Sequence, residues 1–189
     1  MPGDVTSWQH PFVDILKYCK HDKPVSGHVD ISGDVKLILD KQIGKRVWRL
    51  NGAIAASNYL KMPIKKHKTS LNLIGKNIYF QLKISSKKLF SIHIEVEIDF
   101  ASGSKEVFRF SLSNMYKGLG VSKLGSTVQV PLQLPAKWVF LAVNIKSLLV
   151  CIFAIIFSDL ADPQAIESPT FDTISDIFHR IRLSYILLL

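Results

Sequence analysis

The chain has 189 residues with a formal net charge of +9, and 48% of the residues are hydrophobic. A chain of this length can bury a stable core without disulfides or a structural metal, and it is long enough for one domain with a short extension. Its two cysteines, Cys19 and Cys151, are far apart in the sequence, and the first residues form no apolar signal-peptide core. We therefore expect a protein of a reducing compartment, the cytosol by default.

The first predicted element is a short helix near the N-terminus. Its apolar residues have the helical spacing i, i+3, i+4 and i+7 and are Phe12, Ile15, Leu16 and Cys19. Pro11 precedes them, and proline is tolerated in the first turn of a helix.

Short runs rich in apolar residues follow and predict β-strands. The candidates are residues 35–39, 47–50, 53–60, 78–84, 91–100, 107–112, 128–134 and 138–145. Asn51-Gly52 separates the second run from the third, and this dipeptide predicts a hairpin turn because both residues tolerate positive φ. Many short strands at this spacing indicate a mainly β fold, which we expect to be an antiparallel, jelly-roll-like β-sandwich with one or two short helices.

The run 91–100 has the clearest alternation of apolar and polar residues. One face consists of Ile92, Ile94, Val96 and Ile98, and the other consists of His93, Glu95, Glu97 and Asp99. A small-residue loop leads into the next alternating run, so we expect a hairpin in which Lys105 and Arg109 lie near the acidic stripe. Carboxylates at this spacing could hold calcium or serve glycoside hydrolysis, but we favour a solvated face with salt bridges to the neighbouring strand.

The later part of the chain contains three further signals. Pro131 has no backbone N–H for a sheet ladder and predicts an edge strand or a bulge. Residues 148–157 form a run of ten apolar residues, which as a helix would cross about half of a bilayer core, so a buried strand or helix is favoured over a membrane anchor at 139–157. A second helix is predicted from the spacing of Ile174, Ile177, Phe178 and Ile181.

Positive charge is concentrated in the middle of the chain. Between Asp40 and Glu95 lie 54 residues that include twelve lysines or arginines and no acidic residue. Such a surface attracts anionic partners, and nucleic acid, anionic lipid and acidic protein surfaces all qualify. A solvated face that keeps the protein soluble is the alternative. We favour a partner because no acidic residue compensates the charge over the whole stretch.

Motifs for catalysis, metal binding or cofactor binding are lacking. The six histidines have no H-x₃-H or H-E-x-x-H spacing, and no Gly-x-Ser-x-Gly turn frames a nucleophile. Aromatic residues interleave with the basic stretch as they do in base-stacking surfaces, but on alternating strands most of these rings would face the core. We therefore expect no enzyme activity, no cofactor and no metal, and we disfavour nucleic acid and membranes as partners.

Four short segments carry a family resemblance. They are residues 8–12 (Trp-Gln-His-Pro-Phe), 55–60 (Ala-Ala-Ser-Asn-Tyr-Leu), 70–75 (Ser-Leu-x-Leu-x-Gly) and 110–117 (Phe-Ser-Leu-Ser-Asn-Met-Tyr-Lys). In this order they resemble the domain family typified by cilia- and flagella-associated protein 20, over about residues 7–145. The opening and the last segment look closest to the domain at the N-terminus of a WD-repeat protein in that family.

The resemblance implies a non-catalytic β-sandwich that binds microtubules. Family members lie at the inner junction of ciliary doublets or on the centriole wall, so the implied partners are tubulin and other centriolar or axonemal proteins. The implied location is the cytoskeleton of the centriole, basal body or cilium, with a role in cilium and centriole assembly. The family motif supplies no binding residues, so we choose clustered lysines in predicted loops as contacts, namely Lys61, Lys65, Lys66, Lys68, Lys87 and Lys88. A glycan- or nucleic-acid-binding β-sandwich is the alternative.

The chain departs from the family pattern after residue 145. We expect a β-sandwich domain over residues 1–145 and a divergent apolar tail over residues 146–189, where the family should continue with polar-patterned strands. The last four residues, 186–189, are all apolar, which is unusual for a soluble protein. Our hypothesis is that the tail comes from a truncated or alternative gene model and that the sandwich lacks its last strands.

Overall fold

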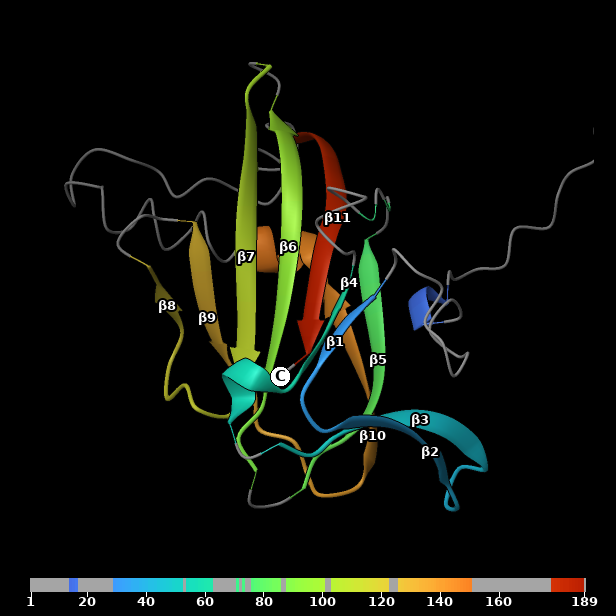
Figure 1. The fold of residues 1–189 in the computed structure, drawn as a ribbon. Coiled ribbons are helices and arrows are strands. Elements are labelled where there is room, and N and C mark those ends of the chain that lie inside the picture. The colour runs from blue at the N-terminus through green and yellow to red at the C-terminus, as the bar shows by residue number, and fades with distance from the viewer. Residues whose placement is uncertain are drawn as a thin grey trace, which may run out of the picture.

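The computed structural model describes residues 14–16, 29–52, 54–62, 71, 73, 76–85, 88–100, 103–122, 126–150 and 178–188. Most of these residues form strands, arranged in one large sheet and two strand pairs (Figure 1). The large sheet has the strand order β1 (Asp30–Ser32), β4 (Tyr59–Met62), β11 (Phe178–Leu188), β6 (Ser91–Phe100), β7 (Lys105–Ser113), β9 (Thr127–Pro131) and β8 (Gly120–Val121). The pairs are β10 (Trp138–Asn144) with β5 (Asn77–Lys83), and β2 (Val35–Asp40) with β3 (Lys45–Leu50).

The hydrophobic core lies between the large sheet and the β5–β10 pair. Ile94, Val96, Ile98 and Phe110 of the large sheet are fully buried, and Ile78 and Val143 of the pair are buried in the same cluster. Neighbouring strands are antiparallel except for β7 and β9, which run parallel. The mainly β, largely antiparallel sandwich predicted from the sequence is confirmed.

β6 and β7 form the hairpin that the alternating sequence predicts. Three apolar pairs face each other directly across it, and all six side chains are buried: Ile92 with Leu112, Ile94 with Phe110, and Val96 with Phe108. The turn contains Gly103 at φ 85°, a left-handed conformation that glycine adopts without steric cost. Because side chains alternate between the two faces of a strand, His93, Glu95, Glu97 and Asp99 of β6 face away from the core.

β11 lies in the middle of the large sheet, between β4 and β6 (Figure 1). It pairs antiparallel with both strands, with Ile181 opposite Ile98 and Leu187 opposite both His93 and Lys61. The helix predicted around residues 174–181 is therefore wrong at residues 178–181, which are strand, while residues 174–177 lie outside the described residues. The neighbouring strands favour a strand over a helix here. If residues 178–188 were a helix, the backbone N–H and C=O groups of β4 and β6 that face β11 would lose their hydrogen-bond partners.

The division of the chain after residue 145 stays a prediction. The prediction assumes that the apolar tail has no place in the sandwich. Residues 178–188 of that tail do have one, because they form a central strand of the large sheet. The sheet is continuous from β4 through β11 to β6.

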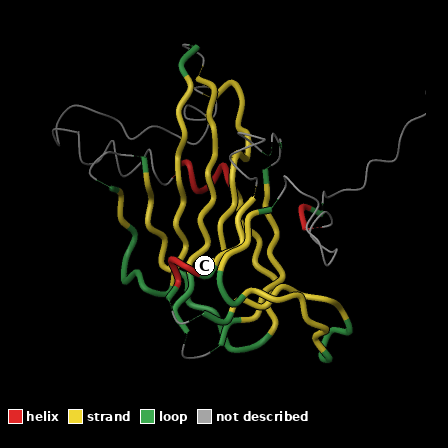
Figure 2. Tube along the Cα trace, in the orientation of Figure 1, coloured by secondary structure: helices red, strands yellow, loops and turns green. Residues whose placement is uncertain are grey.

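Two predicted helical segments are described only in part. Residues 145–150 are helical and lie behind the large sheet in Figure 2. Leu149 of this segment is fully buried in the core. This agrees with a buried helix at the start of the apolar run 148–157, whose remainder lies outside the described residues. Near the N-terminus Ile15 and Leu16 form a short 3-10 turn and pack against the core, and the rest of that predicted helix is not among the described residues. In the described part of the chain, no helix is long and apolar enough to cross a membrane.

Pro131 is the last residue of β9, opposite Ser113 of β7. On its other side β9 pairs with β8 at Val128 and Gln129, and Pro131 extends beyond these residues. The missing proline N–H therefore costs no hydrogen bond to β8. The predicted edge strand is wrong for β9 as a whole, because β9 lies between β7 and the edge strand β8.

The hairpin predicted at Asn51-Gly52 is wrong. β3 pairs with the preceding strand β2, and the chain after Gly52 passes through the 3-10 turn η2 (Ala55–Ser57) into β4. Glycine has a different role at this position. A Cβ atom on Gly52 would lie 1.6 Å from Cγ of Asn58, so the Asn58 side chain occupies the space that any other residue would need.

Candidate partner-binding surface

The β2–β3 hairpin projects from the sandwich (Figure 1) and carries a group of exposed basic side chains. They are Lys36, Lys41, Lys45, Arg46 and Arg49. The acidic residues of the same stretch are Asp34 and Asp40, and both carboxylates have partners within the hairpin. Asp34 lies 2.8 Å from Nζ of Lys36. The hairpin therefore presents an excess of positive charge to solvent.

Asp40 shapes the turn that joins β2 to β3. Its Oδ1 accepts hydrogen bonds from the backbone N–H groups of Gln42, at 2.9 Å, and Ile43, at 3.2 Å. Partial desolvation works to raise the pKa of Asp40, but the two N–H donors, the Trp138 side chain and the charge of Lys83 together hold this pKa below its ordinary value. Gly44 closes the turn at φ 65°, where an added Cβ atom would meet nothing within 4 Å. The turn is thus pre-shaped and places Lys41 and Lys45 at the end of the hairpin.

Lys83 extends this basic surface onto the β5–β10 pair. Its Nζ donates to Oε1 of Gln42 at 3.3 Å, so the end of β5 lies beside the hairpin turn. Across the pair, Lys83 is opposite Trp138, and the exposed Lys137 directly precedes that residue. We group exposed basic residues of the hairpin and of the neighbouring strand pair under one name, the hairpin surface: Lys41, Lys45, Arg49, Lys83 and Lys137.

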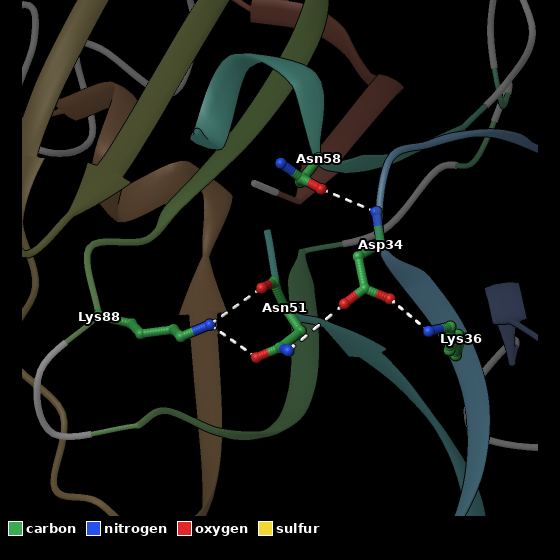
Figure 3. A network of polar contacts seen from close by, with 5 residues as sticks. All are labelled: Asp34, Lys36, Asn51, Asn58 and Lys88. Carbon is green, nitrogen blue, oxygen red and sulfur yellow. Dashed lines mark hydrogen bonds and ion pairs between the residues drawn. The ribbon is translucent and has the colours of Figure 1, made fainter. Parts of the chain in front are cut away.

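A polar network holds the base of the hairpin against the sandwich (Figure 3). Oδ1 of Asn58 accepts from the backbone N–H of Asp34 at 2.8 Å, and Nδ2 of Asn51 donates to Oδ2 of Asp34 at 3.4 Å. Hydrogen bonds from Lys36 and Asn51 lower the pKa of Asp34, so its carboxylate stays ionised. Nζ of Lys88, from the loop between β5 and β6, donates to the backbone oxygen and Oδ1 of Asn51 at 3.1 and 2.6 Å.

Two of the six predicted contact lysines lie within the described residues. Lys61 is half-buried in β4, opposite Asp30 of β1. Lys88 is exposed, but its ammonium group binds Asn51 in the network of Figure 3. The other four, Lys65, Lys66, Lys68 and Lys87, lie outside the described residues. The contact role of the six lysines stays a prediction. Their selection did not include the hairpin, where Lys41, Lys45, Arg46 and Arg49 belong to the same acid-free stretch.

The acidic stripe of β6 is paired with basic residues of β7. Nε of Arg109 donates to Oε1 of Glu95 at 2.9 Å. Nζ of Lys105 lies 3.8 Å from Oε1 of Glu97 and 3.5 Å from Oδ1 of Asp99. The predicted salt bridges across this hairpin are confirmed. Among the residues that the structure describes, no group of three His, Cys, Asp or Glu side chains could hold a metal ion.

A comparison with protein families identifies the chain. Its sequence matches the CFA20 domain over residues 4–168. The chain belongs to the CFA20 domain family. This confirms the resemblance inferred from the four short segments, and the matched range continues beyond residue 145.

Curated relatives of this CFA20 domain are much longer proteins. Centriole proteome protein 16 of Chlamydomonas reinhardtii is 36% identical over 172 residues, which are 90% of this chain and 8% of the relative. WD repeat-containing protein 90 of Homo sapiens is 31% identical over 131 residues, 69% of this chain and 7% of the relative. Its counterpart in Xenopus tropicalis is 34% identical over 110 residues, 58% of this chain and 6% of the relative. The chain thus spans less than a tenth of each of these relatives, and none of their names describes an enzyme.

Several motif residues that indicated the CFA20 domain make hydrogen bonds between separate segments of the fold. Asn114 accepts a hydrogen bond from the backbone N–H of Phe90 at 3.0 Å and donates to the backbone oxygen of Lys88 at 2.9 Å. The buried Oγ of Ser113 donates to the backbone oxygen of Phe90 at 2.6 Å. Asn58, from another motif segment, anchors the base of the β2–β3 hairpin. These motif residues stabilise the fold, so a partner surface has to be sought on other side chains.

Proposed function

We propose that this CFA20 domain is a non-catalytic structural module that binds microtubules through its hairpin surface. The observation that carries the proposal is the projecting β2–β3 hairpin, whose turn presents Lys41 and Lys45 to solvent while Asp40 is held by backbone donors. The proposed place is the inner junction of ciliary doublets or the centriole wall, and the proposed role is support of cilium and centriole assembly. The name of Centriole proteome protein 16 supports a centriole location.

The physical basis of the proposal is charge complementarity with an acidic protein surface. Exposed charges on a projecting element raise the local concentration of an oppositely charged partner and accelerate association. Salt weakens such attraction because the Debye length falls to about 8 Å at physiological ionic strength. Tubulin is the acidic partner that the family resemblance implies, with other centriolar or axonemal proteins as further candidates.

The experiment is co-pelleting of the full chain with stabilised microtubules over a series of salt concentrations. Two microtubule preparations are compared, one intact and one trimmed of its acidic tails by protease. We expect binding at low salt that weakens as salt is added, and the trimmed sample shows whether the tails or the lattice carry it. A folded chain that stays in the supernatant at the lowest salt would exclude direct binding.

Variants assign the binding to the hairpin surface. Replacing Lys41, Lys45 and Arg49 together by Gln should weaken low-salt binding by about tenfold, since an exposed charge pair contributes roughly 0.2–1 kcal/mol. Lys117→Gln removes the same kind of charge from an exposed loop after β7 and should leave binding close to wild type. If both variants bind alike, the hairpin is not the contact.

Two further variants test the other predicted contacts. The first variant replaces the four predicted lysines outside the described residues by Gln and tests their contribution to microtubule binding: Lys65, Lys66, Lys68 and Lys87. It leaves Lys61, which lies opposite Asp30, and Lys88, which binds Asn51, unchanged. Glu95→Gln combined with Glu97→Gln should not change binding, because these carboxylates are occupied by Arg109 and Lys105. A large loss in that double variant would assign the contact to the β6–β7 face.

A further inference from the structure

The outward face of the β5–β10 pair carries two exposed aromatic rings. Tyr79 is 52% exposed and Phe140 is 70% exposed. Their ring centroids lie 5.6 Å apart with an interplanar angle of 25°, so the two rings stack on each other. The opposite face of the same pair packs on the core through Ile78 and Val143. The rings are therefore held on a rigid support while much of their surface remains in water.

Exposed aromatic rings of this kind favour contact with an apolar group of a partner over contact with water. Phe140 has no polar group that solvent could satisfy, and the Tyr79–Phe140 stack joins two such surfaces into one apolar patch. A contiguous apolar patch on an otherwise polar surface marks an interaction site more often than a single exposed residue does. Aromatic side chains in particular bury large areas when a partner covers them.

Basic residues stand at both ends of this aromatic face. Lys83 and Lys137 lie at the end beside the hairpin turn, and the exposed Lys76 precedes β5 at the other end. The strands themselves, Asn77–Lys83 and Trp138–Asn144, contain no acidic residue. From Lys76 to Lys83 an extended chain covers roughly 23 Å, at about 3.3 Å per residue. The face is thus apolar in its middle and positive at its ends.

We propose that this aromatic face binds an extended acidic peptide segment of a protein partner, with one aromatic or other large apolar side chain near the middle of the segment. The central side chain packs on Tyr79 and Phe140, and the acidic residues on either side lie near Lys76 and Lys83. The inference rests on the proposed function, because Lys83 belongs to the hairpin surface as well. It adds a contact that salt does not screen.

A carbohydrate fits this face less well than an acidic peptide. Sugar hydroxyl groups need several hydrogen-bonding side chains around the stacking rings. Nδ2 of Asn144 donates to Oδ1 of Asn77 at 3.0 Å, and Oδ1 of Asn144 accepts from the backbone N–H of Ser147 at 2.9 Å. These amides are already engaged with each other and with the start of the helix at 145–150, whereas the lysines match an acidic chain.

The experiment measures the full chain against two fluorescein-labelled heptapeptides by fluorescence anisotropy at low salt. One has the sequence Glu-Asp-Glu-Phe-Glu-Asp-Glu, and the other has Ser in place of the central Phe, so that both carry the same charge. We expect the Phe peptide to bind about tenfold more tightly, because burial of the ring contributes beyond the shared electrostatic attraction. Equal affinities, or no binding of either peptide, would overturn the inference.

Two variants locate the preference for the Phe peptide. Phe140→Thr should remove it while circular dichroism shows an unchanged fold, since Thr is favoured in strands. Tyr79→Thr should act in the same direction. The control is Leu39→Thr on the hairpin, which removes a side chain that is 65% exposed and should leave the tenfold preference intact. A preference that survives in Phe140→Thr would overturn the inference.

The outcomes also separate this inference from the proposed function. If the hairpin variant weakens microtubule pelleting about tenfold but no preference for the Phe peptide exists, the proposed function stands and the aromatic site is wrong. A preference that is lost in Phe140→Thr while wild-type chain fails to pellet with microtubules supports the aromatic site and refutes microtubule binding. Displacement of the Phe peptide by neutral cellohexaose would show that the face is a glycan site and would overturn the peptide assignment.

Discussion

Gly52→Ala tests the conclusion that the Asn58 side chain organises the base of the β2–β3 hairpin. A Cβ atom at Gly52 would lie 1.6 Å from Cγ, 1.8 Å from Nδ2 and 2.0 Å from Oδ1 of Asn58. No such contact is tolerated, so the Asn58 amide has to move. That amide accepts from the backbone N–H of Asp34 at 2.8 Å and donates to the backbone oxygen of Ile54 at 2.6 Å.

The expected cost follows from these two hydrogen bonds and from the crowding. Each bond contributes about 0.5–1.5 kcal/mol to the free energy of unfolding, and forcing extra volume into a packed site costs roughly 1–3 kcal/mol. Gly52→Ala should therefore lower the free energy of unfolding by about 2–4 kcal/mol. Small domains have about 5–15 kcal/mol in total, so the loss is large enough to measure by urea unfolding followed by circular dichroism.

A double-mutant cycle isolates the contact between Gly52 and Asn58. Asn58→Ala alone should cost about 1–3 kcal/mol, because it removes the same two hydrogen bonds. In the Asn58→Ala background the new methyl group of Gly52→Ala meets no amide, so the double variant should be more stable than the sum of the single effects predicts, by about 1 kcal/mol or more. Gly118→Ala, where nothing lies within 4 Å of the added Cβ, is the control. Additive effects of Gly52→Ala and Asn58→Ala would refute the reasoning.

Two further predictions concern the core and the pH dependence of stability. Phe110→Ala, at a side chain with 0% exposure, should lower the free energy of unfolding by about 3–5 kcal/mol, whereas Val107→Ala, 48% exposed on the same strand, should cost less than about 1 kcal/mol; equal urea midpoints would contradict the assigned strand faces. Burial, with a contribution from Arg109, lowers the pKa of His93 below its ordinary 6.5, although Glu95 acts in the opposite direction. The unfolded chain then binds the proton more readily, so stability should fall as pH drops from about 6.5 towards the folded pKa, and His93→Gln should flatten that part of the urea-midpoint profile.

The strands of the core were predictable because burial imposes a period of two on the sequence. In β6 every second residue from Ile92 to Ile98 is buried, and a one-residue slip would expose all of them. The same criterion was ambiguous for β11, where Phe178 and Ile181 also fit a helical period. The choice there depends on β4 and β6, whose residues are far away in the sequence. Local spacing contains no information about such partners.

For the basic residues, too, the sequence does not show which long-range contacts each side chain makes. Composition predicts the sign of the charge in the acid-free stretch, and it treats Lys45, Lys61 and Lys88 as equivalent. The structure separates them through long-range contacts: Lys88 is bound to Asn51, 37 residues away, and Lys61 stands in a strand of the large sheet opposite Asp30. A charge that is bound to its own fold must break that contact before it can serve a partner, and breaking it costs part of the binding free energy. Asp40 accepts hydrogen bonds from the backbone N–H groups of Gln42 and Ile43. It therefore does not need Lys41 or Lys45 as a donor in the way that Asn51 uses Lys88. For the proposed function we therefore expect Lys41 and Lys45 to be more effective contacts than Lys88.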